Sequence, residues 1–580
     1  MSVNRYELEI RLRTTSPLHS GGVDEVADRS QKDRKRAGEL AEVECTPRRF
    51  ARDGAGRAVL TGRSIKGAVR AACAQLFPEA EKMRERVFGK ESQRGYGKGG
   101  DAGWGALLQF HPILLGETQT ETDLMLRTGI AVDRHWGAVA DGALFQHEVL
   151  PTNRELTLRI TAEVGASSTA QDEHKVAAAG FRERRGRDQT LEDYLAHARG
   201  KFDPDLLDDV AVQFTFAQII AALATERVAF GGRKGAGWGR VELAEPGSWK
   251  CTRVDVASLH GLQALLRGEP EAVELQVPQD TARLQPLRFK IAWHSPTGIL
   301  VAATPPKASA DSTPPPTEKD AVPTEPLLAW QTSSRQSGES NQDAAKPAPL
   351  VLPGSSVRGA LRSRASRIAR TILAARESLE HPDWSATDVH TQLRQDAPLV
   401  RDLFGDTTRR GAVTVLETLA NPVSRESWVT VSHNAGDRWT GGVAIGAFYK
   451  ETYPLPQWND IVIEVDPLRL PAGTLPDENS AWTDRRRAAL CLLGLVLAEL
   501  ATGSLPLGSR VTRGLGEVKV EAVTLENWPS GESVLGGSGL EIAQKLLEYL
   551  QGLEVVGRPD VQEVAGWASY LWPERRTGDA

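Results

Sequence analysis

The sequence has few cysteines and no long apolar stretch. Its 580 residues include four cysteines, which are scattered and form neither a CxxC pair nor a cluster with histidine. A structural zinc site is therefore not expected, and dispersed thiols are typical of the reducing cytoplasm. No run of about 18 apolar residues occurs, so we expect no membrane span. The opening MSVNRYELEIRL leads directly into an alternating strand and lacks the apolar core of a signal peptide.

The chain also lacks an excess of positive charge. Its formal net charge is −6, from 70 Lys and Arg against 76 Asp and Glu. This balance does not by itself indicate nucleic-acid binding, although a global value can hide a local basic face. Length predicts two to four domains, and an apolar content of 40% is ordinary for a globular chain.

The most informative feature is a phrase that occurs twice. LTGRSIKGAVR at 60–70 returns as LPGSSVRGALR at 352–362. In each copy a glycine, Gly62 or Gly354, is free to adopt backbone angles that side chains forbid, and a helix with an apolar face follows. The phrase therefore predicts a tight turn that leads into a helix, once in each half of the chain.

Polar residues at these two helix starts are typical of an anion site. We expect Ser64 and Ser356 to cap the first free amides, and Lys66 and Arg358 to lie in the first turn. Free amides and a nearby cation together attract a phosphate. For a single copy, a plain strand-to-helix turn with a solvated cation is an equally ordinary interpretation.

Further phrases recur in the same order in both halves. They are a Ser-Pro phrase at 15–17 and 294–296, a Phe-Gly phrase at 87–89 and 403–405, strand openings at 105–108 and 411–414, an Asp-Arg phrase at 131–134 and 436–438, a second strand phrase at 142–145 and 446–449, and glycine-rich loops at 231–243 and 508–520. An ordered internal repeat of this kind predicts two homologous domains.

Each half reads as strand, loop, helix, strands, helix, glycine loop and strand. This order predicts an α+β fold with a mainly antiparallel sheet, of the ferredoxin-like or RNA-recognition topology, in two tandem copies. We expect a first domain at 1–245, a connection at 246–285, a second domain at 286–521 and a C-terminal helical extension at 522–580. The Pro- and Ser-rich segment 303–349 is predicted to be a largely disordered insertion.

Taken together, these phrases resemble the RAMP superfamily of CRISPR-associated proteins. The closest likeness is to the backbone subunit of type III interference complexes, and two copies in one chain are similar to the fused backbone subunits of subtype III-D. The resemblance implies a modified RNA-recognition fold that binds CRISPR RNA along its backbone, with a thumb-like hairpin that kinks the guide. It also implies that some members cut target RNA with an acidic residue and a divalent metal such as Mg²⁺.

A guide-binding protein must hold variable sequences, so phosphates and 2′-hydroxyls are its expected targets. Glycine-rich backbone lets main-chain amides approach phosphates closely. The alternatives are that the glycine loops are only tight β-turns and that each Asp-Arg phrase is a local ion pair. The candidate RNA-binding residues are Ser64, Lys66, Arg134, Arg233 and Lys234 in the first half, and Ser356, Arg358, Arg438, Arg510 and Arg513 in the second.

The catalytic motif of the family is not cleanly kept. In the family an Asp usually stands two residues before a proline in the loop that precedes the GxSxxG phrase. Here Cys45 stands before Pro47, and Thr324 before Pro326. The candidate catalytic residues are therefore neighbouring loop acids and a histidine that matches a family position: Glu44, Asp28, Asp33, Glu325, Asp320 and His19, with Glu44 and Glu325 as the metal ligands.

The loop acids could equally be solvated and His19 structural, and three functions stay open. The chain could be a double backbone subunit that binds CRISPR RNA and cuts single-stranded target RNA. It could be the same scaffold without chemistry, or a metal-independent ribonuclease that processes guide RNA with His19 as its base. A tandem module for a protein or small molecule has no motif in its favour. The expected partners are CRISPR RNA, target RNA and other complex subunits, in the cytoplasm and without a membrane.

Overall fold

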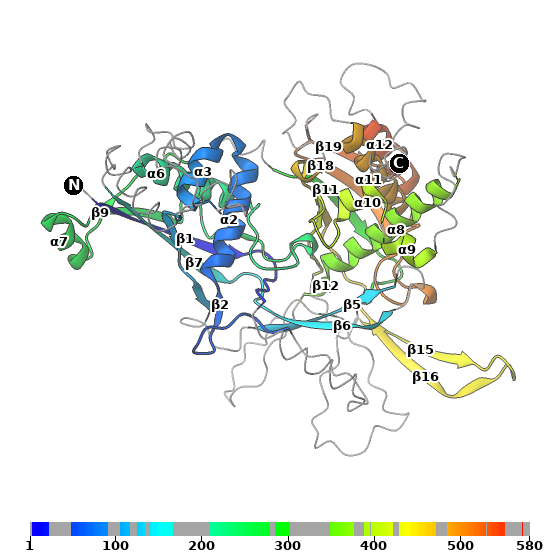
Figure 1. Ribbon diagram of the computed structural model, residues 1–580. Coiled ribbons are helices and arrows are strands. Elements are labelled where there is room, and N and C mark those ends of the chain that lie inside the picture. Colours follow the sequence, from blue (N-terminus) through cyan, green and yellow to red (C-terminus); the bar gives the residue numbers. More distant parts are fainter. Residues whose placement is uncertain are drawn as a thin grey trace, which may run out of the picture.

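The computed structural model describes residues 3–21, 48–90, 105–115, 124–133, 139–165, 208–278, 285–301, 327, 349–375, 388–394, 396–421, 428–470, 484–528, 531–551 and 571. The chain forms two α+β halves that lie side by side, and each carries a long β-hairpin on the same side of the molecule (Figure 1). No helix within these ranges is both long and apolar enough to cross a membrane. The cytoplasmic location expected from the cysteines stays a prediction.

The first half is built on an antiparallel sheet with β1 (Val3–Thr14) at its centre. The strand order is β10-β9-β1-β7-β3, and β8 also pairs with β1. The other members are β3 (Leu108–Phe110), β7 (Glu155–Gly165), β8 (Val241–Leu243), β9 (Trp249–Asp255) and β10 (Glu271–Ala272), with helices α2 (Gly62–Leu76), α3 (Glu81–Phe88), α6 (Asp208–Ala224) and α7 (Leu259–Arg267). The path strand, helix, two strands, helix, strand, with the last strand beside the first, confirms the ferredoxin-like topology.

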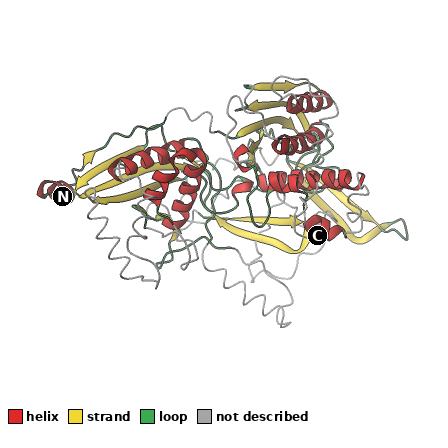
Figure 2. Ribbon diagram, turned by 45° about the horizontal axis from the view of Figure 1, so that its top comes forward, coloured by secondary structure: helices red, strands yellow, loops and turns green. Residues whose placement is uncertain are grey.

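The second half repeats this plan around β11 (Leu287–His294). Its sheet order, β13-β17-β11-β18-β19, is the first order read in the opposite direction. The other members are β13 (Val413–Val415), β17 (Ile461–Val465), β18 (Lys519–Glu526) and β19 (Ser533–Gly536), with helices α8 (Gly354–Ala375), α9 (Val389–Arg394), α10 (Pro398–Phe404), α11 (Asp484–Ala501) and α12 (Gly539–Gln551). In the first half α2 and α6 pack on one face of the sheet, and in the second α8 and α11 do so, whereas α7 projects beyond the end of its sheet (Figure 1 and Figure 2).

Paired short strands and the two hairpins complete each half. The pairs are β2 (Ala58–Leu60) with β4 (Ile113–Leu115), and β12 (Val351–Leu352) with β14 (Thr418–Leu419). The hairpins are β5 (Met125–Val132) with β6 (Val139–Val149), and β15 (Val429–Gly436) with β16 (Val443–Tyr453). Both hairpins have the same register and the same irregularity near the tip.

Alternation along the central strands sets which face is buried. Leu8, Ile10 and Leu12 of β1 are fully buried, and the charged residues between them face outward. On α2, Ile65 and Val69 recur at helical spacing and are also fully buried. The central helices α6 and α11 are apolar around most of their circumference, because sheet and neighbouring helices enclose them.

The duplication extends to individual hydrogen bonds. In the first half the amide of Gly239 donates to the Pro17 carbonyl at 2.8 Å, and the amide of Gly232 donates to the His19 carbonyl at 2.9 Å. In the second half Gly516 donates to Gly298 and Ser509 to Leu300, both at 2.9 Å. The amide of residue 240 donates to the Ser16 hydroxyl at 2.9 Å, and that of residue 517 to the Thr297 hydroxyl at 3.1 Å. Two homologous domains are therefore confirmed at atomic level.

These bonds correct the alignment of the Ser-Pro phrases. The equivalent of Ser16 is Thr297 and not Ser295, because the pairing of Arg13 with Glu242 is repeated by that of His294 with Lys519, three residues before each hydroxyl. The Ser-Pro pairs at 16–17 and 295–296 therefore do not occupy equivalent positions in the two domains.

The expected caps are also wrong. Thr61, and not Ser64, caps α2, and its hydroxyl accepts from the Ser64 amide at 3.4 Å. Ser356 lies two residues inside α8, and its amide donates to the Pro353 carbonyl. Gly62 and Gly354 are needed for space and not for unusual backbone angles, because a Cβ there would collide with the carbonyl oxygens of residues 110 and 415.

Two domain boundaries differ from the prediction. Residues expected as a connection at 246–285 include β9, α7 and β10, and β9 pairs with β1 along most of its length. Residues expected as an extension after 521 include the end of β18, β19 and α12, which packs on α11 through Ile542, Leu546 and Leu550. A short or irregular strand has a weak pattern, so both sheets extend further than the sequence indicates. The insertion 303–349 lies almost entirely outside the described residues.

The halves meet through charged side chains and through the first glycine loop. Arg240 donates to Glu464, which also accepts from Arg288 at 2.8 Å. Burial alone would raise the pKa of Glu464, but the two guanidinium groups outweigh it and hold that pKa below its usual value. A second bridge joins Arg227 to Asp466 at 2.9 Å. Breaking such a buried pair by removing one partner costs about 3–5 kcal/mol, so these bridges fix how the halves sit.

Gly239→Ala is predicted to destabilise the first half. Gly239 has a φ of 80°, and a Cβ there would collide with the Phe230 carbonyl. We expect a loss of at least about 2 kcal/mol in the free energy of unfolding, measured by urea denaturation. Gly232→Ala in the same loop is the control, since nothing lies within 4 Å of a Cβ there. It should change stability by less than about 0.5 kcal/mol. Equal effects of the two substitutions would contradict the claim that the close approach of Gly239 to the Phe230 carbonyl requires a glycine.

Candidate nucleic-acid interface

In the first half, Arg233 is the centre of an aromatic and histidine cluster. It has a left-handed backbone, with φ 55°, which turns its side chain onto hairpin β5–β6. Its guanidinium carbon lies 4.1 Å from the centre of the Phe145 ring and 5.5 Å from that of Trp238. Its Nε donates to Nε2 of His147 at 3.3 Å. Burial, with the neighbouring Arg48, lowers the pKa of Arg233 to about 10, so the group remains a cation at neutral pH.

Two histidines stack edge to face beside this cation. The rings of His19 and His147 are 4.8 Å apart, and both side chains are buried. Nδ1 of His19 lies 2.7 Å from the Glu148 carbonyl. Burial, reinforced by Arg233, lowers the pKa of His147 to about 3, and burial also lowers the pKa of His19. Both rings are therefore neutral at physiological pH.

His147 presents an unused proton donor. Its Nε2 accepts from Arg233, so its Nδ1 carries the proton, and this buried atom has no hydrogen-bond partner within the described part of the chain. A buried donor without an acceptor costs about 1–3 kcal/mol. The cluster therefore combines a cation and a free N–H, which suits a phosphate or hydroxyl oxygen.

The loop that carries the first set of candidate acids starts and ends at this cluster. Gly21, next to His19, bridges to Phe50, and Arg48 bridges to His147. The Glu148 carboxylate accepts from the Phe50 amide at 2.8 Å and holds the returning strand in place. Residues 22–47 connect these two points and include Asp28, Asp33 and Glu44, which lie outside the described residues. Gly21 and Arg48, the described residues at the two ends of this loop, therefore lie beside the histidines.

The second half keeps the cation and loses the histidines. Arg510 has φ 62° and takes the place of Arg233 in an identical loop path. By hairpin register and loop hydrogen bonds, the equivalents of His147 and His19 are Glu451 and Leu300. Arg513, also exposed, corresponds to an alanine of the first loop. The two halves therefore present different chemistry at matching places.

The two helix-start cations have different surroundings. Arg358 donates to the carbonyls of Val413 and Phe404, and its guanidinium lies against Gly235 of the first glycine loop. Burial lowers the pKa of Arg358 to about 10. Lys66 occupies the equivalent place on α2, and burial with nearby Arg70 lowers its pKa. Arg358 thus belongs to the contact between the halves.

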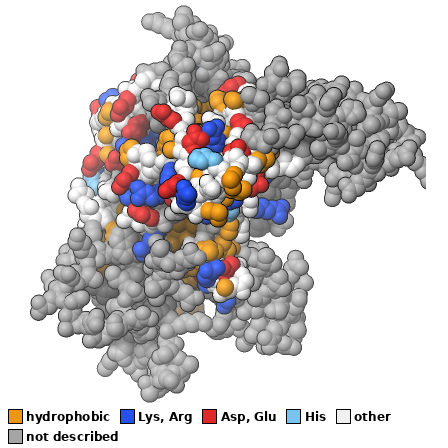
Figure 3. Space-filling model, turned by 90° about the vertical axis from the view of Figure 1, so that its left-hand side faces the viewer, with side chains coloured by type: hydrophobic (Ala, Val, Ile, Leu, Met, Phe, Trp, Pro, Cys, Tyr) orange, Lys and Arg blue, Asp and Glu red, His pale blue; other side chains and the backbone are white. Residues whose placement is uncertain are grey.

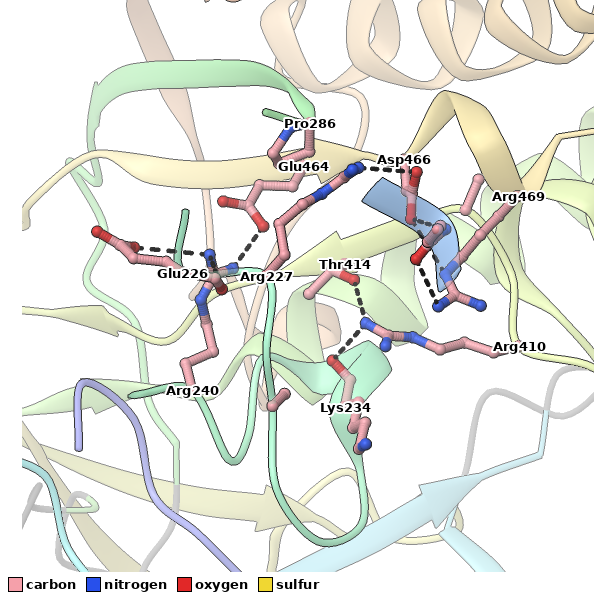
Figure 4. Close-up of a pocket in the computed structure, with 13 residues that line it drawn as sticks. Glu226, Arg227, Lys234, Arg240, Pro286, Arg410, Thr414, Glu464, Asp466 and Arg469 are labelled. Carbon is pink, nitrogen blue, oxygen red and sulfur yellow. Dashed lines mark hydrogen bonds and ion pairs between the residues drawn. The ribbon is translucent and has the colours of Figure 1, made fainter. Parts of the chain in front are cut away.

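The remaining candidates are spread over the molecule. Lys234 lines a cavity between the halves (Figure 4), and Arg438 is exposed at the tip of β15–β16 beside Trp439, which is 96% exposed. Arg134, Asp320 and Glu325 lie outside the described residues. No group of three or more His, Cys, Asp or Glu among the residues that are described could hold a metal. On the end of the first half shown in Figure 3, basic and acidic side chains alternate, in keeping with the net charge.

Sequence reasoning missed four members of the cluster: Arg48, Phe145, His147 and Trp238. Phe145 and His147 alternate on one face of β6, and Trp238 stands between two glycines of the loop. Both residues lie in or beside phrases of the internal repeat. The second half has Glu451 and Leu515 where the first has His147 and Trp238, and this difference between the halves is the sequence signal for the site.

The fold and this cluster define a tandem pair of ferredoxin-like domains, each with a protruding hairpin and a cationic glycine loop. The family model of the RAMP superfamily matches residues 11–242 and 350–519, and the chain belongs to that superfamily. The two matched regions are the two halves seen in the structure. No curated protein matches the chain. RAMP proteins bind CRISPR RNA and other subunits of their complexes, which makes this chain a CRISPR-associated RNA-binding subunit.

His147 is predicted to make the protein less stable in mild acid. Its pKa is about 3 when folded, against an ordinary 6.5, so between these values only the unfolded chain takes up the proton. Folding stability is therefore full above about pH 6.5 and falls as the pH drops below it, by about 1 kcal/mol from pH 7 to 5.5. Urea midpoints of His147→Gln should lose much of this slope. His260→Gln, at an exposed position on α7, should keep the wild-type slope, and an unchanged slope in His147→Gln would contradict the assignment.

Proposed function

We propose that the chain is a double backbone subunit of a type III CRISPR complex, similar to the fused subunits of subtype III-D. Each half holds a stretch of guide RNA, with the cations of its glycine loop and the tip of its hairpin on the sugar-phosphate backbone. The equivalent loop paths of Arg233 and Arg510 support two such places in one chain. The two loops stand at equivalent places in the repeat, which suits RNA that continues from one half to the next.

The observation that carries the backbone role is the way the halves join. The contact is heterologous, because the first half contributes its glycine loop and hairpin base, and the second contributes the start of α8 and the β13–β14 turn. A Cβ on Gly237 would be 2.7 Å from the Val415 carbonyl, and Arg127 pairs with Glu417 at 3.5 Å. A heterologous contact leaves one copy of each surface unused, so it can repeat along a chain of subunits.

The unused socket lies at the far end of the second half. A cavity of about 270 Å³ is lined there by Val429, Val431, Tyr453, Leu455 and Leu515, together with Pro296, Thr297, His433, Arg513 and Gly514. In the first half the equivalent place receives the turn of residues 415–417. The empty socket has Val431 where the filled one has Arg127, and Leu515 where it has Trp238.

The unused turn at the other end matches this change. It is the β3–β4 turn of the first half, and by strand register Pro112 stands there at the place of Glu417. Arg127 and Glu417 form an ion pair between the halves. At the two outer surfaces their equivalents are Val431 and Pro112. Removing both charges together avoids an unpaired buried charge. This match supports a neighbour of the same kind at each end.

We also propose that target RNA is cut at the first half by a divalent metal held by Glu44. The ends of its loop lie at His19 and His147, and Leu300 replaces the histidine in the second half. A metal-held carboxylate would stabilise charge on the scissile phosphate, and the neutral histidines would position it. Glu325 is the corresponding candidate in the second half.

Cleavage of a complementary target by the RNA-loaded complex tests this proposal. Cutting should need Mg²⁺, stop with chelator, and fall at least a hundredfold in Glu44→Ala. Glu325→Ala is the matched control and should retain the cut assigned to the first half. Cutting of the guide itself in chelator, lost in His19→Ala, would favour guide processing. No cutting under either condition would leave a scaffold without chemistry.

Val431→Glu is predicted to block addition of a neighbour without affecting RNA binding. A carboxylate in the socket would be desolvated against Pro112 of the neighbour, at a place where the wild type has an apolar side chain. On RNA long enough for several copies, the wild-type chain should form complexes with more than one copy by native mass spectrometry. Val431→Glu should stop at one copy, and Val534→Glu, at a position that is 65% exposed, should behave as wild type. Wild-type complexes of one copy at every RNA length would contradict the proposal.

A further inference from the structure

The cavity between the halves gathers more positive than negative side chains. It has a volume of about 50 Å³ and is lined by five cations and three carboxylates, which leaves two positive charges in excess. The cations are Arg227, Lys234, Arg240, Arg410 and Arg469, and the carboxylates are Glu226, Glu464 and Asp466. Figure 4 shows the arginines and carboxylates of this set meeting from both halves.

All three carboxylates are already engaged by three of the arginines. Glu464 accepts from Arg240, and Glu226 lies 3.7 Å from the same guanidinium. Asp466 is 2.9 Å from Arg227 and 3.2 Å from Arg469, and it also accepts from Gln75 at 2.7 Å. The three carboxylates of the cavity are therefore already paired with Arg227, Arg240 and Arg469.

Two cations remain without a carboxylate partner in the part of the chain that is described. Arg410, at the exposed mouth of the cavity, donates to the Thr414 hydroxyl at 3.1 Å and to the Lys234 carbonyl at 3.4 Å. Among the described residues, the charged groups that act on Lys234 are Arg410 and Arg469, and neither is a carboxylate. Burial, followed by repulsion from Arg410 and Arg469, lowers the pKa of Lys234 to about 8. An anion placed among these three cations would relieve that repulsion.

We propose that this cavity binds a small oxyanion of the phosphate class, held by Arg410, Lys234 and Arg469. Its volume of about 50 Å³ leaves room for a single tetrahedral phosphate group. Arginine and lysine are the usual phosphate donors of proteins. Lys234 belongs to the first half and the two arginines to the second, so the anion would join the halves. The site is separate from the Arg233 cluster and does not depend on the proposed function.

Two sources of this chemistry are possible, free inorganic phosphate and a phosphodiester of bound RNA. Calorimetric titration of the full RNA-free chain with inorganic phosphate, at constant ionic strength against chloride, measures the first. The same titration on the RNA-saturated chain, together with the RNA affinity of each variant, measures the second. Arg410→Gln is the main variant, because its exposed position makes misfolding improbable, and Lys234→Gln is a second. Arg267→Gln, exposed at the end of α7, is the matched control.

We expect wild type and Arg267→Gln to bind phosphate equally, and Arg410→Gln and Lys234→Gln to bind at least about tenfold more weakly. If RNA leaves phosphate binding unchanged, the ligand is free phosphate. If RNA abolishes it and Arg410→Gln weakens RNA binding by a similar factor, the ligand is a phosphate of the RNA. Absence of binding in the wild type, or equal binding in all four proteins, would overturn the proposal.

Discussion

Each half of the molecule depends on one contact between main chains, where the glycine loop crosses the end of the first strand. In the first half the loop amides donate to the carbonyls of Pro17 and His19, and in the second to those of Gly298 and Leu300. Side chains are excluded from these crossings, because a Cβ on Gly231 or Gly239 would collide with a carbonyl. A left-handed arginine lies within each loop, and in the first half Arg233 lies against the hairpin. A backbone constraint thus places the candidate phosphate ligand.

The same geometry is used for different purposes in the two halves. The first loop is covered by the second half, so Gly237 packs on the 415–416 backbone and Lys234 enters the cavity between them. The second loop is open and borders the apolar socket. At the place of the histidine pair the second half has Leu300 and Glu451. Duplication therefore preserved the scaffold, and substitution gave the matching places of the two halves different side chains.

The fold could be predicted from sequence because it rests on local pattern and repetition. Alternation in β1, the two apolar helices at 208–224 and 484–501, and the paired glycine loops are all visible in the letters. The errors arose where three-dimensional contact decides. Nothing in the sequence indicates that Gly62 makes room for the Phe110 carbonyl, that Arg358 donates to two carbonyls, or that Thr297 and not Ser295 stands at the place of Ser16. His147 and Trp238 join the site because hairpin and loop meet, which no spacing predicts.

The central claim is that two repeated halves hold one continuous RNA strand by its backbone. The structure of the chain with a single-stranded guide RNA bound, determined by electron cryomicroscopy, tests it most directly. The account predicts one strand that crosses both halves in a single direction, with a phosphate beside Arg233 and another beside Arg510. RNA confined to one half, or bound away from both glycine loops, would contradict it.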